Sequence, residues 1–333
     1  MRTPRSYRRF IALASSVVFA VLSCHALAAA HFGIDRIVAF GTSLTDTGNA
    51  FIWLSEPENG TCGTALNVPP YDALDDLLVP DGPYAVGGHH FTNGATWVEG
   101  MARYLTLAGN VRPALEGSGT EATNYAVGGA RAVTGYPCRF NLPEQVGTYL
   151  SDFSQTSPQS LVVIEIGAND VRDALVMAAA GQDPAPTLAN ALGSLADTIV
   201  QLYAHGAREF LLLNVPDIGK TPAVRGLGET AVYFGGLLSA SYNAGLASVV
   251  SELQTLLPGI DIRILDIDET LNDVVDDPGT YGFVNATDAC VTPNQPPFKC
   301  AKPDTYVFWD GIHPTKALHA IVAQQAISVI SAH

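Results

Sequence analysis

The chain has 333 residues, of which 47% are hydrophobic and only 15% are charged. This composition supplies a sizeable buried core and excludes a largely disordered chain. The formal charge is −15 at pH 7. Such a surface repels phosphate backbones, so we expect no nucleic-acid partner. It also weakens electrostatic attachment to anionic membranes, whereas transient apolar contact with lipid surfaces stays open.

Residues 1–30 have the pattern of an export signal, a signal peptide. Four arginines open the chain, residues 11–22 form an apolar run, and residues 26–28 provide a cleavage site of small residues. The apolar run is shorter than a membrane-spanning helix requires. We therefore expect a protein that is secreted or periplasmic after cleavage, with residues 31–333 as a single domain. Anchoring as a lipoprotein through Cys24 is the alternative.

Four cysteines follow the export signal: Cys62, Cys138, Cys290 and Cys300. An even number in an exported protein suggests disulfides, with three possible connectivities. Proximity in the sequence favours Cys290 with Cys300, which leaves Cys62 with Cys138. No C-x-x-C or H-E-x-x-H spacing occurs, so the sequence gives little support for a metal site.

Short apolar runs alternate with helical patterns along the chain. Runs typical of strands buried on both faces occupy residues 35–40, 123–127, 161–166, 209–214 and 261–267. Helices are predicted at residues 187–205, 230–257 and 315–330. This alternation predicts an α/β fold in which helices pack on both faces of a parallel sheet.

Residues 50–120 differ from the rest, because they are rich in turn residues and scattered aromatic side chains and show no clear strand period. We expect most of this segment to form a cap-like insertion over the functional site, with residues 96–107 helical. No linker-like composition marks the border of a second domain.

Small and polar residues follow three successive predicted strands, where parallel sheets place their chemistry. Ser43 follows the first strand, Gly129 the second and Asn169 the third. Ser43 would lie where a strand ends and a helix begins, with its backbone N–H directed toward developing negative charge. Taken alone, Ser43 is better explained as a helix cap and Asn169 as a turn residue.

An Asp-Gly-Ile-His-Pro motif near the C-terminus favours a catalytic role for Ser43 and Asn169 instead. Asp310 can accept a hydrogen bond from one ring nitrogen of His313, which leaves the other nitrogen free to act as a base. Ester hydrolysis through a covalent intermediate requires a nucleophile, a base and donors to an oxyanion. We expect Ser43 to be the nucleophile, His313 its base and Asp310 the residue that orients the base. The oxyanion donors would be the N–H groups of Ser43 and Gly129 and the amide of Asn169.

Four blocks of the sequence resemble those of the GDSL, or SGNH, hydrolase family, and they occur in the family's order. They are FGTSLTDTGN from Phe40, NYAVGGA from Asn124, GAND from Gly167 and DGIHP from Asp310. One block is a weak match, whereas four in order are specific and cover nearly all of the chain after the export signal. The resemblance implies a flavodoxin-like three-layer α/β/α sandwich, hydrolysis of carboxylic esters without a cofactor, and the same roles for the residues named above.

Two positions within these blocks need separate comment. The family carries an Asp directly before the nucleophilic serine, where this chain has Thr42. By the resemblance, that Asp steadies the nucleophile loop by hydrogen bonding. We expect the Thr42 hydroxyl to do part of this, so that loop rigidity and rate change but not the reaction class. The spacing from Asn124 favours Gly129 over Gly128 as the oxyanion donor.

Other polar residues have simpler explanations. We expect Asp170 to cap the helix that follows it. The adjacent His89 and His90 read as an exposed pair in a loop, and His319 as a packing or surface residue within the last helix.

The sequence as a whole predicts a serine esterase or lipase that acts on a small-molecule or lipid ester through an acyl-enzyme. Phospholipase, lysophospholipase or acyltransferase activity at the same site stays open, as does deacetylation of polysaccharides. A non-catalytic binding protein on the same scaffold is less favoured, because nucleophile, base and oxyanion donors are all present. The oligomeric state cannot be read from the sequence.

Overall fold

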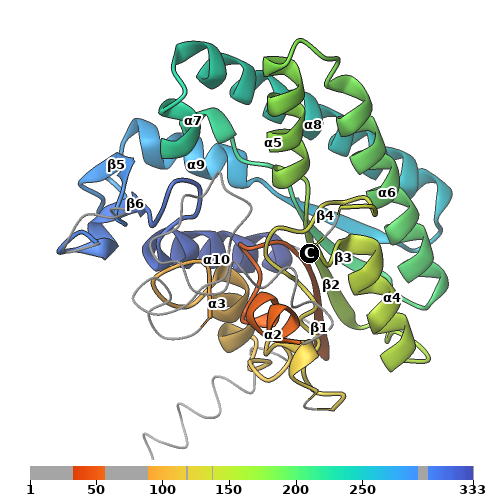
Figure 1. The fold of residues 1–333 in the computed structure, drawn as a ribbon. Helices are drawn as coiled ribbons and strands as arrows, with labels where there is room; N and C mark the ends of the chain where they lie inside the picture. Colours follow the sequence, from red (N-terminus) through yellow and green to blue (C-terminus); the bar gives the residue numbers. More distant parts are fainter. Residues whose placement is uncertain (1–32, 57–88, 118, 137, 292–298, 333) are drawn as a thin grey trace, which may run out of the picture.

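The computed structural model describes residues 33–56, 89–117, 119–136, 138–291 and 299–332. At its centre lies a four-stranded parallel sheet (Figure 1) made of β1 (Arg36–Gly41), β2 (Ser160–Glu165), β3 (Glu209–Leu213) and β4 (Asp261–Leu265), in that order. A smaller sheet pairs β5 (Asn285–Ala289) with β6 (Tyr306–Phe308). The predicted export signal and Cys24 lie outside the described residues.

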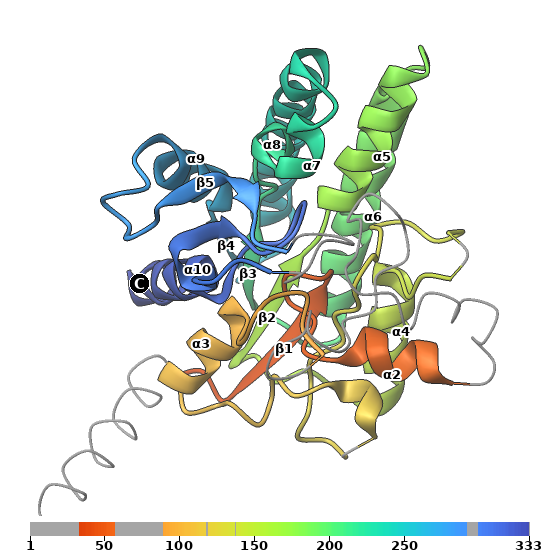
Figure 2. The same cartoon turned by 60° about the vertical axis from the view of Figure 1, so that its left-hand side comes forward.

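Helices cover both faces of the central sheet, as Figures 1 and 2 show. One face carries α4 (Leu142–Asp152), α5 (Ala168–Ala179), α6 (Ala185–Ala204) and α8 (Glu229–Leu256). The other carries α3 (Trp97–Tyr104) and α10 (Lys316–Ser331). The remaining elements are α2 (Asn49–Ser55), α7 (Pro222–Arg225), α9 (Ile267–Asp276) and the 3-10 turns Ala114–Glu116, Ile218–Lys220 and Pro303–Thr305. The fold is thus the predicted three-layer α/β/α sandwich.

The alternation of side chains along β2 divides the core into two layers. Val162 and Ile164 pack among α4, α5, α6 and α8, whereas Leu161 and Val163 pack against α3 and α10. All six residues of β2 are buried, as expected for a strand covered on both faces. This double coverage is the reason why unbroken apolar runs marked β1, β2 and β3. β4, at the edge of the sheet, carries Asp261 and Arg263 and, contrary to the prediction, is only partly buried.

The segment 123–127, predicted to be a strand, is not one, although it lies beside β1 at the sheet edge. Tyr125 N–H donates to the carbonyl of Ala39 (2.7 Å) in strand-like fashion. The N–H of Gly41 in β1, however, donates to Gln145 Oε1 (2.9 Å) and not to this segment. One bond of a regular ladder is therefore missing, so only an isolated parallel bridge forms.

The position of this segment defines the topology. Counted by place in the sheet, segment 123–127 and the four strands have the chain order 2-1-3-4-5, which is the flavodoxin-like order. In such sheets ligands bind outside the carboxyl ends of the strands, at the point where the order reverses. That point lies between β1, which ends at Gly41 shortly before Ser43, and β2, which ends at Glu165 shortly before Asn169.

The predicted helices are confirmed, with ends that shift by up to three residues. The predicted cap at residues 50–120 includes residues 57–88, which lie outside the described residues. Helix α3, in the same segment, packs beside α10 on the sheet. None of the helices in the described ranges is long and apolar enough to cross a membrane.

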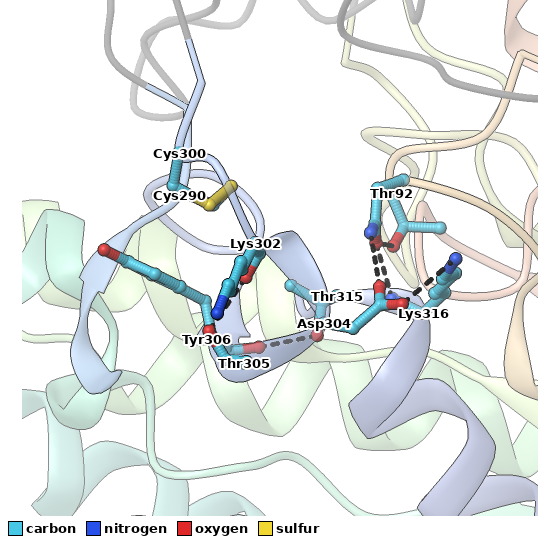
Figure 3. Close-up of a disulfide and its surroundings, with 10 residues drawn as sticks. Thr92, Cys290, Cys300, Lys302, Asp304, Thr305, Tyr306, Thr315 and Lys316 are labelled. Atoms are coloured by element: carbon cyan, nitrogen blue, oxygen red, sulfur yellow. Dashed lines mark hydrogen bonds and ion pairs between the residues drawn. A yellow bond between two sulfur atoms is a disulfide. The ribbon is translucent and has the colours of Figure 1, made fainter. Parts of the chain in front are cut away.

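A disulfide joins Cys290 to Cys300, as predicted (Figure 3). The backbone N–H of Cys290 also donates to the last carbonyl of β6 (3.1 Å). The bridge therefore fixes the segment that leads into the loop with the predicted base. Cys138 is disulfide-bonded as well. Its predicted partner, Cys62, lies outside the described residues.

Candidate active site

The predicted base, His313, lies in direct contact with both the predicted nucleophile, Ser43, and the predicted orienting residue, Asp310. His313 Nε2 lies 2.7 Å from Ser43 Oγ, and His313 Nδ1 lies 2.6 Å from Asp310 Oδ2. Ser43 follows β1, whereas Asp310 and His313 follow β6. Asp310 and His313 are each 1% exposed, so their hydrogen bonds lie in a water-poor environment that strengthens electrostatic interactions. A proton can pass from the serine hydroxyl to the imidazole at these distances.

The carboxylate of Asp310 is held by the backbone that follows it. Its Oδ1 accepts the N–H groups of Ile312 (2.8 Å) and His313 (2.6 Å). Its Oδ2 remains for Nδ1 of the imidazole, which fixes the direction of the ring. With Nδ1 donating to the carboxylate, Nε2 is the ring nitrogen that can accept the serine proton.

The sequence suggested that Ser43 lies where a helix begins. In the structure it lies in a single tight turn instead. The N–H groups of Thr45 and Asp46 both donate to the carbonyl of Thr42 (3.1 and 2.9 Å). The next helix, α2, begins only at Asn49. The direction of the Ser43 N–H is therefore set by this turn.

The other predicted oxyanion donors come from two neighbouring segments. Asn169 lies in the first turn of α5, and its amide donates one hydrogen to the carbonyl of Ala130 (2.9 Å). Gly129 has φ +78°, in the left-handed region that favours glycine. Its carbonyl accepts the guanidinium of Arg131 (2.7 Å), which holds the peptide in place.

One cavity of about 60 Å³, which we call the Ser43 pocket, is lined by Ser43, Asn169, His313 and Arg172. Gly129 and Asp310 are not among the residues that line it. Its other walls include Leu44, Ala168, Pro216, Ile218, Val224 and Ile312. The pocket thus combines a serine hydroxyl, an imidazole and a side-chain amide with apolar walls. Within the described ranges, no three His, Cys, Asp or Glu residues are grouped so as to hold a metal ion.

A family model described as GDSL-like lipase/acylhydrolase matches residues 37–326 of this chain. The chain belongs to the GDSL-like lipase/acylhydrolase family. The match contains every residue of the site described above, and it confirms the family suggested by the four sequence blocks. With this membership, the protein is a carboxylic ester hydrolase.

Relatives of this GDSL-like hydrolase occur in plants and bacteria. A GDSL esterase/lipase of Arabidopsis thaliana is 27% identical, over 95% of this chain and 91% of that protein. The phosphatidylcholine-sterol acyltransferase of Aeromonas hydrophila is 24% identical, over 89% of this chain and 90% of that protein. A crystal structure of an acetylxylan esterase from Geobacillus stearothermophilus aligns with a TM-score of 0.44 and 15% identity, over 90% of this chain and 94% of that one.

A buried carboxylate that the sequence analysis missed supports the turn that holds Ser43 in this GDSL-like hydrolase. Glu165, the last residue of β2, accepts the N–H (3.0 Å) and the hydroxyl (2.8 Å) of Thr42. It also accepts a side-chain hydrogen bond from Thr45, whose hydroxyl oxygen receives the indole N–H of Trp97 (3.1 Å). Thr42 therefore forms hydrogen bonds next to Ser43, and its partner is Glu165 of the neighbouring strand.

Burial raises the pKa of Glu165 to about 7, against the hydrogen bonds from Thr42 and Thr45, which lower it. The folded protein therefore binds this proton more tightly than the unfolded chain, whose reference value is 4.5. The resulting stability is present below that reference value and is lost as the pH rises through the folded value.

We expect the free energy of unfolding of the wild type, relative to Glu165→Gln, to fall by about 3 kcal/mol between pH 4 and pH 8. The glutamine keeps the size of the side chain but cannot titrate, so the subtraction isolates this one group. Urea unfolding of both proteins at the two pH values measures it. Parallel stability profiles of the two proteins would contradict the shifted pKa.

Asp46 links the turn that holds Ser43 to the loop that contains Gly128 and Gly129. Its carboxylate accepts the N–H groups at the start of α2 and the N–H of Gly128 (2.7 Å). Burial raises the pKa of Asp46 to about 6, against these four backbone hydrogen bonds. The N–H of Gly128 is therefore engaged inside the protein.

The predicted capping role of Asp170 was wrong. The N-terminal cap of α5 is Gly167, and the carboxylate of Asp170 accepts the N–H of Ala132 (3.2 Å to each oxygen). Burial raises the pKa of Asp170 to about 7. The residue thus ties α5 to the loop after the glycines instead of capping its own helix.

The expectation of an exposed His89–His90 pair was also wrong. The ring of His89 stacks on Phe51 with 3.5 Å between ring centroids. His90 is buried, and its Nε2 lies 3.2 Å from a carboxylate oxygen of Glu99 in α3. The next residue, Phe91, places its ring 5.2 Å from that of His313. This segment therefore packs against the site.

The chain continues from there into contacts with the loop that carries His313. The hydroxyl of Thr92 donates to the carbonyl of Pro314 (2.8 Å), and Asn93 accepts the N–H of Lys316 (2.7 Å). The Lys316 ammonium in turn pairs with Asp304 (3.3 Å; Figure 3). Two hydrogen bonds thus secure the start of α10 directly behind His313.

Proposed function

We propose that this ester hydrolase is a serine esterase or lipase that works through an acyl-enzyme on Ser43. The observation that carries the proposal is the pair of contacts made by His313, 2.7 Å to Ser43 Oγ and 2.6 Å to Asp310 Oδ2. In this role His313 is the base and Asp310 orients it. A cluster with only a structural role would not require a serine hydroxyl on a pocket wall.

The reaction would begin when Nε2 of His313 takes the proton of Ser43 as Oγ attacks the ester carbonyl. The tetrahedral intermediate carries a negative oxygen, and His313 passes its proton to the leaving alcohol. Water, activated by the same nitrogen, then attacks the acyl-enzyme and releases the acid. Asp310 stabilises the imidazolium in both steps without taking its proton.

The oxyanion would receive hydrogen bonds from the N–H groups of Ser43 and Gly129 and from the second amide hydrogen of Asn169. Gly129 is favoured over its neighbour Gly128 because the Gly128 N–H already donates to Asp46. The first amide hydrogen of Asn169 is held by the carbonyl of Ala130, which orients the second. Hydrogen-bond donors that are already in position before the reaction stabilise the transition state without having to reorganise.

Turnover of p-nitrophenyl esters, from acetate to palmitate, tests this proposal directly. We expect the wild-type protein to release p-nitrophenol from at least part of the series without an added metal or cofactor. Absence of turnover over the whole series would speak against a general esterase and for the non-catalytic alternative.

The same acyl-enzyme would also serve an acyltransferase. The full-length similarity to a phosphatidylcholine-sterol acyltransferase gives this second function a specific basis. An alcohol would then replace water in the second step. Comparing free acid with newly formed ester in the presence of an added alcohol separates hydrolysis from transfer. Export through residues 1–30 is part of the proposal, with release to the periplasm or the medium.

A further inference from the structure

A second cavity lies directly behind the wall of the Ser43 pocket. It also measures about 60 Å³ and is bordered by the ends of β3 and β6 and by helices α3, α9 and α10. Four residues line both cavities: Leu44, Pro216, Thr221 and Ile312. Leu44 follows the nucleophile in the sequence, and Ile312 precedes the base. This inner cavity therefore begins at the side chains that flank the reacting atoms.

The inner cavity offers hydrocarbon to an occupant. Its further walls include Leu213, Ile267, Leu271, Phe308, Leu318 and Val322. The two threonines that line it have partners within the protein. The hydroxyl of Thr221 donates to the carbonyl of Ile218 (2.6 Å), and that of Thr270 to the carbonyl of Asp266 (2.8 Å).

The imidazole in this lining, His319, is a packing residue, in line with the sequence analysis. Its Nδ1 accepts the backbone N–H of Trp97 (3.2 Å). Burial lowers the pKa of His319 to about 3, so the ring is neutral at physiological pH. The cavity thus presents no charge, and a sugar or a glycerol group would lose its hydrogen bonds to water on entering.

We propose that the inner cavity binds the acyl chain of the ester, which passes from Ser43 between Leu44 and Ile312. The inference rests on the proposed function of Ser43. Apolar walls of this kind favour hydrocarbon over water, because apolar surface leaves water and the lining atoms gain dispersion contacts with the chain. The cavity therefore determines specificity for the acyl group.

The size of the cavities limits the chain. Two cavities of about 60 Å³ each leave room for a short acyl chain, on the order of four to six carbons. Within that range each methylene that enters should raise kcat/KM by about fourfold, since burying a methylene is favourable by that factor. Longer chains would gain no further from the cavity.

The test narrows or widens the far end of the inner cavity. Val322→Phe fills it from α10, and Leu271→Ala enlarges it from α9. Ile330→Phe is the matched control, because Ile330 is buried in the same helix and core layer but does not line the cavity. The measured quantity is kcat/KM for p-nitrophenyl acetate, butyrate, hexanoate and octanoate, in which only the acyl chain varies.

We expect Val322→Phe to lower the hexanoate-to-acetate ratio of kcat/KM at least about tenfold. Leu271→Ala should move the optimum to longer chains, and it decides the question alone if the phenylalanine variant does not fold. Ile330→Phe should keep the wild-type ratio. A hexanoate-to-acetate ratio unchanged by the lining variants would overturn the proposal. Wild-type protein inactive even on acetate would instead refute the proposed function itself.

Discussion

Ser43→Ala is expected to lower kcat for p-nitrophenyl butyrate by roughly a factor of 10⁶, as loss of the nucleophile does in serine hydrolases. The alanine removes the hydroxyl that lies 2.7 Å from His313 Nε2 and leaves the turn otherwise unchanged. The turn itself is held by backbone bonds to Thr42 and by Glu165, none of which involves the Ser43 hydroxyl. Folding should therefore persist, with a melting temperature close to that of the wild type.

Ser160→Ala is the matched control for this change. Ser160 is also buried but begins β2, at the opposite end of the same sheet. It should keep wild-type turnover, measured together with the thermal unfolding of each protein. A Ser43→Ala protein with the wild-type rate would remove the nucleophile from the account. Equal losses in both variants would point to a structural effect.

Asp310→Asn is expected to lower kcat by about 10⁴-fold, the effect of the same change in a serine protease triad. The carboxylate accepts two backbone N–H groups and the Nδ1 proton of His313 at once. An amide can satisfy the two backbone donors with its oxygen, but it then presents N–H to Nδ1. The imidazole would carry its proton on Nε2 and could not accept the proton of Ser43.

The control for this prediction is Asp304→Asn. Asp304 lies on the same segment, where it contacts Asn93 and Lys316 at the surface. Loss of its charge should change kcat by no more than about twofold, because exposed ion pairs contribute little. Steady-state kinetics of both variants with one ester measures the difference. An Asp310→Asn rate within tenfold of the wild type would show that this carboxylate does not orient the base.

The sequence predicted the parts of the site that depend on short spacings or on strand ends. Asp310 and His313 are three residues apart, so their contact follows from one loop. Ser43 and Asn169 each follow a strand buried on both faces, and the apolar runs located those strands. Parallel strands end at one edge of a sheet, which brought the two residues together.

Contacts between distant segments could not be predicted in the same way. Glu165 and Thr42 are 123 residues apart, and their hydrogen bonds depend on the register of β1 against β2. A single signal was present, because Glu165 is the charged residue at the end of an otherwise apolar run. A charge retained there, at the functional edge of the sheet, indicates a buried partner.

Two other errors have identifiable causes. Segment 123–127 has the composition of a strand, but the N–H of Gly41 in β1 donates to the side chain of Gln145 and interrupts the ladder. The polarity of His89 and His90 suggested exposure. Instead, an aromatic neighbour and the Glu99 carboxylate satisfy the two rings within the fold. Neither partner could be inferred from composition alone.

The most direct test of the central claim is covalent labelling of the protein with an alkyl fluorophosphonate, which reacts with activated serine hydroxyls. Peptide mass spectrometry locates and counts the adduct. We predict one phosphonyl group per chain on Ser43, with loss of esterase turnover in proportion to labelling and no adduct in Ser43→Ala. An adduct on another residue that tracks the loss of activity, or full activity with Ser43 modified, would contradict the account.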